Sequence, residues 1–110
     1  MTIYAVSDAS EFKDDNLETD SNTLIFLILY SSHDHNEDLR HRIEKLSNSP
    51  EFAEVKFHEH KVHDDDSELA MEYHVKHFPT CLYLKGGQVV DMVVMPKDEK
   101  DVVEKLARNK

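Results

Sequence analysis

Residues 78–95, FPTCLYLKGGQVVDMVVM, carry the clearest fold signal in this chain of 110 residues. Two runs rich in β-branched and aromatic residues flank Gly86 and Gly87, the only glycines of the chain. Such runs favour strands, and glycine supplies the positive φ that a tight hairpin turn needs. Pro96 ends the second run because proline cannot donate a hydrogen bond to a strand ladder. The stretch therefore predicts an antiparallel hairpin, and the polar-apolar pattern of residues 97–110 predicts a closing helix.

A continuous apolar run, TLIFLILY at 23–30, lies upstream of the hairpin. Because it lacks the alternation of a strand with one wet face, we expect a central strand covered on both faces. Further strands are expected at residues 2–7 and 54–62, and helices at residues 8–15, at residues 34–47 and from Asp66 onward. This order, βαβαβαββα, is typical of an α/β protein in which a central mixed β-sheet is flanked by helices on both faces.

Composition excludes several classes of partner. The formal net charge is -10, so a nucleic-acid backbone or an anionic membrane surface would be repelled. No apolar run approaches the roughly 20 residues that cross a bilayer, and the N-terminus lacks the regions of a signal peptide. One cysteine, Cys81, cannot form an intramolecular disulfide. We therefore expect one domain over residues 1–110 in the cytoplasm or the nucleus, with no nucleic-acid or membrane partner.

Several stretches resemble thioredoxin, and the resemblance covers nearly the whole chain. VKHFPTCLYLKGGQVV at 75–90 is similar to the thioredoxin segment in which a cis-proline precedes a strand, a K-x-G turn and another strand. Pro79 takes the position of that proline, and Thr80 follows it as in the family. TLIFLILYSSHDH at 23–35 resembles the strand that delivers the W-C-G-P-C motif, and SELAMEYHV at 67–75 resembles the helix before the proline loop. The resemblance implies a thioredoxin-like fold.

The same resemblance indicates that the catalytic motif has been replaced. It places Ser31 at the tryptophan, Ser32 at the nucleophilic cysteine, His33 and Asp34 at the Gly-Pro pair, and His35 at the resolving cysteine. Thioredoxin chemistry needs a thiolate that attacks a disulfide and a second thiol that releases the mixed disulfide. Neither sulfur is present in the motif, so these four residues, 32–35, are degenerate active-site positions.

Two further departures agree with this loss. The buried acid of the family, which assists deprotonation of the second cysteine, is replaced by Phe26. The glycine that follows the hairpin and opens the substrate groove is missing from VVDMVVMPKDEK at 89–100. We therefore predict a protein without dithiol chemistry, without catalytic residues and without a cofactor. A residual disulfide oxidoreductase role is the alternative that the family resemblance keeps open.

Peptide recognition does not depend on sulfur. In the family, the backbone at the cis-proline pairs with an extended peptide, which is a form of strand addition. We therefore predict a protein-binding or adaptor module whose partner is a protein or an extended peptide. Its groove would lie beside the degenerate loop and comprise Ser31, His77, Phe78, Pro79 and Thr80. A homodimer formed through the apolar residues 89–95 is a further alternative.

Histidines offer an alternative function, although we expect most of the eight to be solvated. His33, His35 and His77 could converge on zinc with an open fourth position, and His58 and His60 form a second pair on one strand face. No H-x-x-x-H ladder or cysteine pair supports either site. A hydrolase built on Ser32 and His35 is disfavoured, because no acid lies behind the histidine and no glycine elbow supports the serine. Helix capping is the simpler role of the serines.

Overall fold

The structure, a computed structural model, describes residues 3–6, 12, 22–31, 37–62, 68–96 and 99–109. Its elements in chain order are β1 (Ile3–Ala5), β2 (Ile25–Ser31), α2 (Glu37–Ser47), the 3₁₀ helix η1 (Pro50–Phe52), β3 (Lys56–Val62), α3 (Glu68–Glu72), β4 (Thr80–Lys85), β5 (Gln88–Val94) and α4 (Glu99–Asn109). The helix predicted over residues 8–15 lies outside the described residues, apart from Phe12, whose side chain is buried. No helix in the described ranges is both long enough and apolar enough to cross a membrane.

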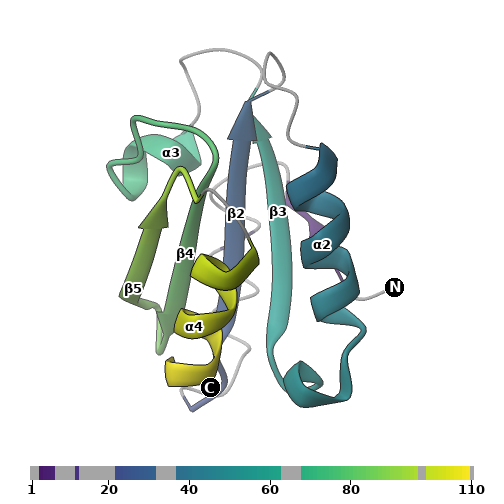
Figure 1. Ribbon diagram of the computed structural model, residues 1–110. Helices are drawn as coiled ribbons and strands as arrows, with labels where there is room; N and C mark the ends of the chain where they lie inside the picture. The colour runs from purple at the N-terminus through teal and green to yellow at the C-terminus, as the bar shows by residue number, and fades with distance from the viewer. Residues whose placement is uncertain are drawn as a thin grey trace.

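The five strands form one mixed sheet in the order β1-β3-β2-β4-β5 (Figure 1). β3 pairs in parallel with both β1 and β2, whereas β4 runs antiparallel to β2 and to β5. The apolar run of residues 25–30 is thus the central strand, and its six side chains are all buried. This arrangement confirms the predicted mixed sheet with a hydrophobic strand at its centre.

Alternation along β2 divides the core into two clusters. Phe26 and Ile28 face the helices α2 and α4, with Ile43, Val102 and Leu106 in the same cluster. The alternate side chains of β2, Ile25, Leu27 and Leu29, face the opposite side of the sheet. Leu69 and Ala70 of α3 and the side chain of Phe12 pack there. Helices therefore cover both faces of the sheet, as predicted (Figure 1).

The predicted hairpin is formed by β4 and β5. Lys85 pairs with Gln88, and the two residues between them, Gly86 and Gly87, have φ angles of 60° and 79°. Two consecutive positive φ angles define the turn that matches the twist of a two-stranded ribbon, and glycine adopts them without a steric penalty. The turn lies at the end of the sheet where β2 begins, because Leu84 pairs with Ile25.

Two histidines of β3 are exceptions to the expected solvation, whereas the other described histidines, His41, His74 and His77, are exposed. His58 and His60 are buried, with exposed fractions of 4% and 7%. The His58 ring lies edge-on to the Phe12 ring, 5.4 Å between centroids, and His60 Nδ1 is 2.8 Å from the carbonyl oxygen of Val6. The segment at Val6 and the Phe12 side chain lie against this face, so the His58 ring packs on an aromatic ring and His60 bonds to a backbone carbonyl. These two histidines are core residues.

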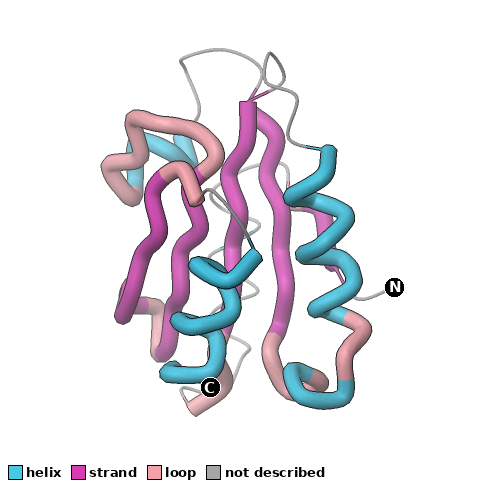
Figure 2. The backbone as a smooth tube through the Cα atoms, in the orientation of Figure 1, coloured by secondary structure: helices cyan, strands magenta, loops and turns pink. Residues whose placement is uncertain are grey.

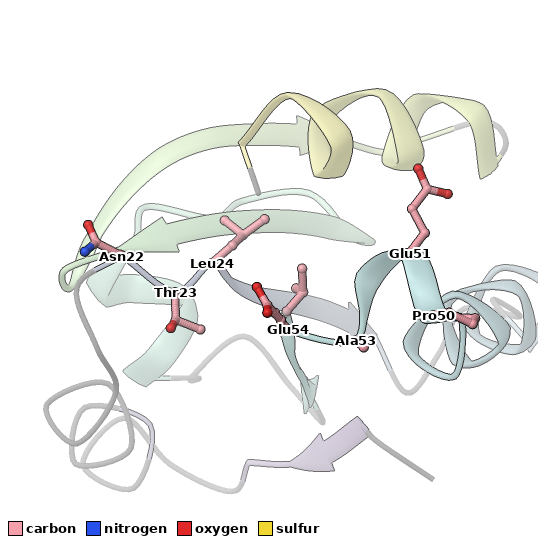
Figure 3. Close-up of a pocket in the computed structure, with 8 residues that line it drawn as sticks. Asn22, Thr23, Leu24, Pro50, Glu51, Ala53 and Glu54 are labelled. Carbon is pink, nitrogen blue, oxygen red and sulfur yellow. The ribbon is translucent and has the colours of Figure 1, made fainter.

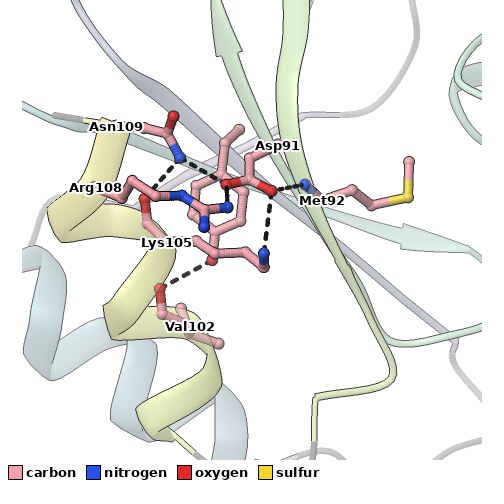
Figure 4. Close-up of polar contacts among 7 residues, drawn as sticks. Asp91, Met92, Val102, Lys105, Arg108 and Asn109 are labelled. Atoms are coloured by element: carbon pink, nitrogen blue, oxygen red, sulfur yellow. Dashed lines mark hydrogen bonds and ion pairs between the residues drawn. The ribbon is translucent and has the colours of Figure 1, made fainter.

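α4 is anchored to the edge strand β5 by a polar cluster around Asp91 (Figure 4). Lys105 Nζ lies 3.2 Å from Asp91 Oδ1, Asn109 donates to Oδ2 at 2.9 Å, and Arg108 donates to the same oxygen. Burial raises the pKa of Asp91, but the hydrogen bonds from Arg108, Asn109 and Lys105 outweigh it and hold the pKa well below its usual range. Asp91 is therefore ionised at neutral pH and satisfied within the fold.

Candidate functional site

The predicted site lies at the end of the sheet where β2 and β3 finish. Ser31 is the last residue of β2 and pairs with Val62, the last residue of β3. The antiparallel ladder between β2 and β4 ends at Leu29 and Thr80. Ser31 and Pro79 therefore lie at the same end of the sheet, the end at which the arrow of β2 points in Figure 1. Ser32, His33, Asp34 and His35 lie outside the described residues, so their approach to Pro79 stays a prediction.

The segment before β4 is fixed by contacts at both ends. The peptide bond between Phe78 and Pro79 is cis, and Pro79 is buried. Thr80, 1% exposed, donates its Oγ1 hydroxyl to the carbonyl oxygen of His77 at 2.6 Å. The backbone N–H of Met95 donates to the carbonyl oxygen of Pro79 at 2.7 Å. Figure 2 shows this connection as a loop that leads from α3 into β4, beside the end of β5.

Phe78 combines a fixed side chain with an open backbone. Its ring is half-buried and packs against the cluster that contains Leu69 and Leu82. In the described part of the chain, neither the N–H nor the C=O of Phe78 takes part in a backbone hydrogen bond. Unpaired backbone groups beside a sheet are a template for an added strand. Phe78 therefore lies directly before a proline segment that is held by hydrogen bonds from Thr80 and Met95.

The other predicted groove residues have different surroundings. His77 is exposed, with only its carbonyl oxygen engaged by Thr80. Of the trio His33, His35 and His77, only His77 is described. No group of three or more His, Cys, Asp or Glu residues in the described ranges is placed to hold a metal ion. His60 turns its Nδ1 to a carbonyl oxygen, so that nitrogen is engaged. The described residues thus give a zinc site no support.

The chemistry of the site is limited by where Cys81 lies. It is two residues after Pro79, but it is completely buried, and burial raises the pKa of its thiol well above the ordinary range. A thiol reacts as its thiolate, and a thiol with such a pKa stays protonated at neutral pH. Phe26 occupies the neighbouring core, with its ring 5.3 Å from those of Phe57 and Tyr83. Among the described residues, the buried cluster around Phe26 contains no Asp or Glu side chain.

A polar unit beside the end of β2 was not predicted from the sequence. The guanidinium of Arg40, on α2, lies 4.5 Å from the ring centroid of Tyr30 and forms an ion pair with Glu59 of β3, at 3.2 Å. Burial and Glu59 raise the pKa of Tyr30, against the lowering effect of Arg40. These contacts join α2 to the end of β2 and to the middle of β3. Arg40 and Glu59 are separated by 19 positions in the chain, so no local pattern links them.

A hollow of about 410 Å³ lies at the opposite end of the sheet (Figure 3). It is lined by Asn22, Thr23, Leu24, Pro50, Glu51, Ala53, Glu54 and Val55. In Figure 3 the carboxylates of Glu51 and Glu54 point in different directions. Ligand sites usually combine an enclosed apolar lining with a few converging polar groups. This hollow lacks such convergence, and it is remote from Pro79.

No protein-family model matches the chain, and no curated protein matches its sequence. Solved structures do match it. Thioredoxin from Fasciola hepatica superposes with a TM-score of 0.86 at 24% identity, over 97% of this chain and 99% of that one. Thioredoxin f2 from Chlamydomonas reinhardtii gives a TM-score of 0.86 at 16% identity, over 98% and 96% of the two chains. Thioredoxin from Malassezia sympodialis gives 0.84 at 21%, over 97% and 90%. The sheet order, the helices on both faces and the proline segment before β4 are together those of the thioredoxin fold.

Proposed function

We propose that this protein is a redox-inactive binding module that holds an extended peptide segment of a partner protein against the edge at Phe78 and Pro79. The observation that carries the proposal is that, among the described residues, neither the N–H nor the C=O of Phe78 takes part in a backbone hydrogen bond, next to a proline segment that is fixed by Thr80 and Met95. A strand edge fixed before binding lowers the entropy cost of adding a peptide. The position of this edge at the carboxyl end of β2 agrees with the thioredoxin fold.

Loss of redox activity is supported by the sulfur content of the chain. Disulfide exchange passes through a mixed disulfide, which a second thiol must resolve. The chain has one cysteine, and that thiol is enclosed in the core with a raised pKa. Solved structures of the same fold are thioredoxins, so the fold itself is compatible with redox chemistry. This chain, with one cysteine, does not supply the two thiols that this chemistry needs.

In this proposal the groove has two walls. Ser31, His77, Phe78, Pro79 and Thr80 form the wall that the sheet and the proline segment fix. We propose that Ser32, His33, Asp34 and His35 form the other wall, as polar contacts without a covalent role. Removal of the thiols would leave recognition without covalent capture, which is the behaviour expected of an adaptor.

Selection from a phage library of random twelve-residue peptides tests the groove. We expect the wild-type protein to enrich a family of related peptides, and Phe78→Asp with His33→Ala to abolish that enrichment. Glu51→Ala with Glu54→Ala, at the remote hollow, is the matched control and should enrich the same peptides. Enrichment by the double variant at Phe78 and His33 equal to that of the wild type would refute the groove.

A second candidate function is self-association through the edge strand β5. Val90, Met92 and Val94 are exposed on this strand, and its one charged side chain, Asp91, turns toward α4. An edge without an outward charge or proline lacks the usual protection against pairing with a second copy. A concentration series in sedimentation velocity tests this candidate: a dimer that Val90→Lys with Val94→Lys removes supports it, and a monomer at all concentrations excludes it.

A further inference from the structure

The backbone of β5 presents hydrogen-bonding groups to the open side of the sheet. β5 is the last strand in the order of the described sheet, with β4 as its neighbour. The N–H of Met95 donates to the carbonyl oxygen of Pro79 on the β4 side. Bonded and non-bonded pairs alternate along an antiparallel ladder, so at Met92 and Val94 the N–H and C=O groups point away from β4. Such outward groups are a template for pairing with another strand.

The Asp91 carboxylate occupies one of these outward groups. Although it turns toward α4, its Oδ1 accepts the N–H of Met92 at 3.0 Å, and Lys105 Nζ lies 3.2 Å from the same oxygen. Arg108 and Asn109 donate to Oδ2, so three side chains of α4 hold the carboxylate in this position (Figure 4). A second strand could bond to the N–H of Met92 only after displacing the carboxylate from it.

The side chains around this carboxylate are apolar and exposed. Val89, Val90, Met92 and Val94 have exposed fractions between 38% and 49%, and they are four of the six exposed large hydrophobic side chains among the described residues. Val90 has no partner in the β4 ladder because the register shifts there, and such a bulge hinders pairing along the half of β5 near the turn. In the other half the ladder is regular, and Asp91 protects it.

The charges beside β5 favour a second copy of this chain as the partner. Lys85 lies at the turn and Lys105 and Arg108 lie toward the end of α4, whereas Glu99 and Asp101 flank Lys100 in its first turn. Figure 1 shows α4 running from the tip of β5 back toward the turn, so β5 has a basic end and an acidic end. Two copies paired antiparallel about a twofold axis place the basic end of each beside the acidic end of the other.

We propose that β5 is a pairing edge that Asp91 blocks in the monomer, and that displacement of the carboxylate from Met92 lets β5 pair antiparallel with β5 of a second copy. The inference rests on the second candidate function, self-association, and names the partner strand and the contact that regulates it. It is independent of the groove at Phe78, which lies on the other side of β4.

Sedimentation velocity of Asp91→Ala tests the block. We expect this variant to dimerise with a dissociation constant at least roughly tenfold below that of wild type, because the N–H of Met92 becomes available on both strands. Glu104→Ala removes the same charge from the exposed face of α4, so it is the matched control and should behave as wild type. Asp91→Ala with Val94→Lys should be monomeric, because lysine on an edge strand opposes pairing.

The outcomes separate this inference from self-association itself. If wild type and Asp91→Ala dimerise equally, Asp91 does not block the edge, while self-association stands. If both remain monomeric at all concentrations, both ideas fail. If Asp91→Ala stays monomeric but enriches library peptides that wild type does not, the edge accepts a foreign strand and a second copy is the wrong partner.

Hydrogen exchange of the wild-type monomer provides a test that needs no variant. The amides of Met92 and Val94 both point to the open side of the sheet, but only that of Met92 donates to Asp91. We therefore expect the Met92 amide to exchange several-fold more slowly than the Val94 amide. Equal rates, measured by NMR on dilute protein, would show that the carboxylate does not hold the Met92 N–H and would overturn the inference.

Discussion

Cys81 lies in β4, opposite Ile28 on one side and Val93 on the other, with its side chain fully enclosed. Its place in the core contrasts with the reactive cysteines of oxidoreductases, which are exposed and have lowered pKa values. Ser31, at the end of β2, is the last described residue before the degenerate positions 32–35. At the scale of single residues, the only thiol of this protein is thus a packed side chain of the core.

The native protein should therefore not react with a thiol reagent. Mixing with 5,5′-dithiobis(2-nitrobenzoate) at pH 8 should release little thionitrobenzoate, because the Cys81 thiol is inaccessible and stays protonated. In denaturant, one equivalent should appear within seconds to minutes. Rapid reaction of the folded protein would show that Cys81 is accessible and would weaken the redox-inactive assignment.

Restoring both sulfurs tests where the degenerate loop lies. Wild type should give no insulin reduction above background when it is supplied with dithiothreitol. Ser32→Cys with His35→Cys should gain measurable activity, because a thiolate and a resolving thiol would then stand beside Pro79. Ser32→Cys alone is the control, since a single cysteine cannot resolve the mixed disulfide. Turnover by the wild type would overturn the proposal.

At the scale of elements, α4 and β5 are held together by polar and apolar contacts. The hydroxyl of Tyr83 donates to the carbonyl oxygen of Val102 at 3.0 Å within the core, and Asp91 joins β5 to the last turns of α4 (Figure 4). One carboxylate therefore joins the middle of β5 to the C-terminal turns of α4. Because β5 leads directly to Met95, the same contact supports the proposed groove.

Asp91→Asn should lower the free energy of unfolding at pH 7 by roughly 1–2 kcal/mol. The pKa of Asp91 is depressed in the folded state, so its stabilisation is present above the unfolded value, near 4, and is lost as pH falls toward the folded value. Urea unfolding at pH 7 and at pH 3 measures the free energy of unfolding of wild type and variant. The difference between the two proteins should be smaller at pH 3. Glu104→Gln, on the exposed face of α4, is the control. An equal difference at both pH values would contradict the ion-pair account.

Local sequence signals were sufficient for most elements of the fold. The glycine pair predicts the β4–β5 turn because positive φ is a local demand, and the unbroken apolar run predicts β2 because both faces of that strand are covered. The burial of His58 depends on Phe12, which is distant in the chain, and the pairing of Arg40 with Glu59 depends on tertiary packing. Neither has a local signal. For the site, the sequence indicated the missing glycine after the hairpin, but not that Met95 would adopt a left-handed conformation.

At the scale of the whole molecule, the dominant property is negative charge. The chain carries 23 acidic and 13 basic residues. Some charges are satisfied in pairs, such as Arg40 with Glu59 and Asp91 with Lys105 and Arg108. The excess of negative charge remains, and repulsion among like charges destabilises a compact chain. This charge also disfavours acidic partners.

Salt should therefore stabilise the protein. Raising sodium chloride from about 20 to about 300 mM shortens the screening length well below the size of the molecule, and we expect the melting temperature to rise by a few degrees. Differential scanning calorimetry measures the shift. A melting temperature that falls with salt would mean that the attractive pairs at Arg40 and Asp91 contribute more than the excess negative charge.

The Gly86–Gly87 turn has a practical consequence for studying this protein. It is exposed, a methyl group at Gly87 would meet no atom within 4 Å, and it lies at the far end of β4 from Pro79. A cysteine introduced at Gln88 would be far more accessible than the enclosed native thiol. Immobilising the molecule on a sensor chip through that position would leave the opposite end of the sheet facing the flowing analyte.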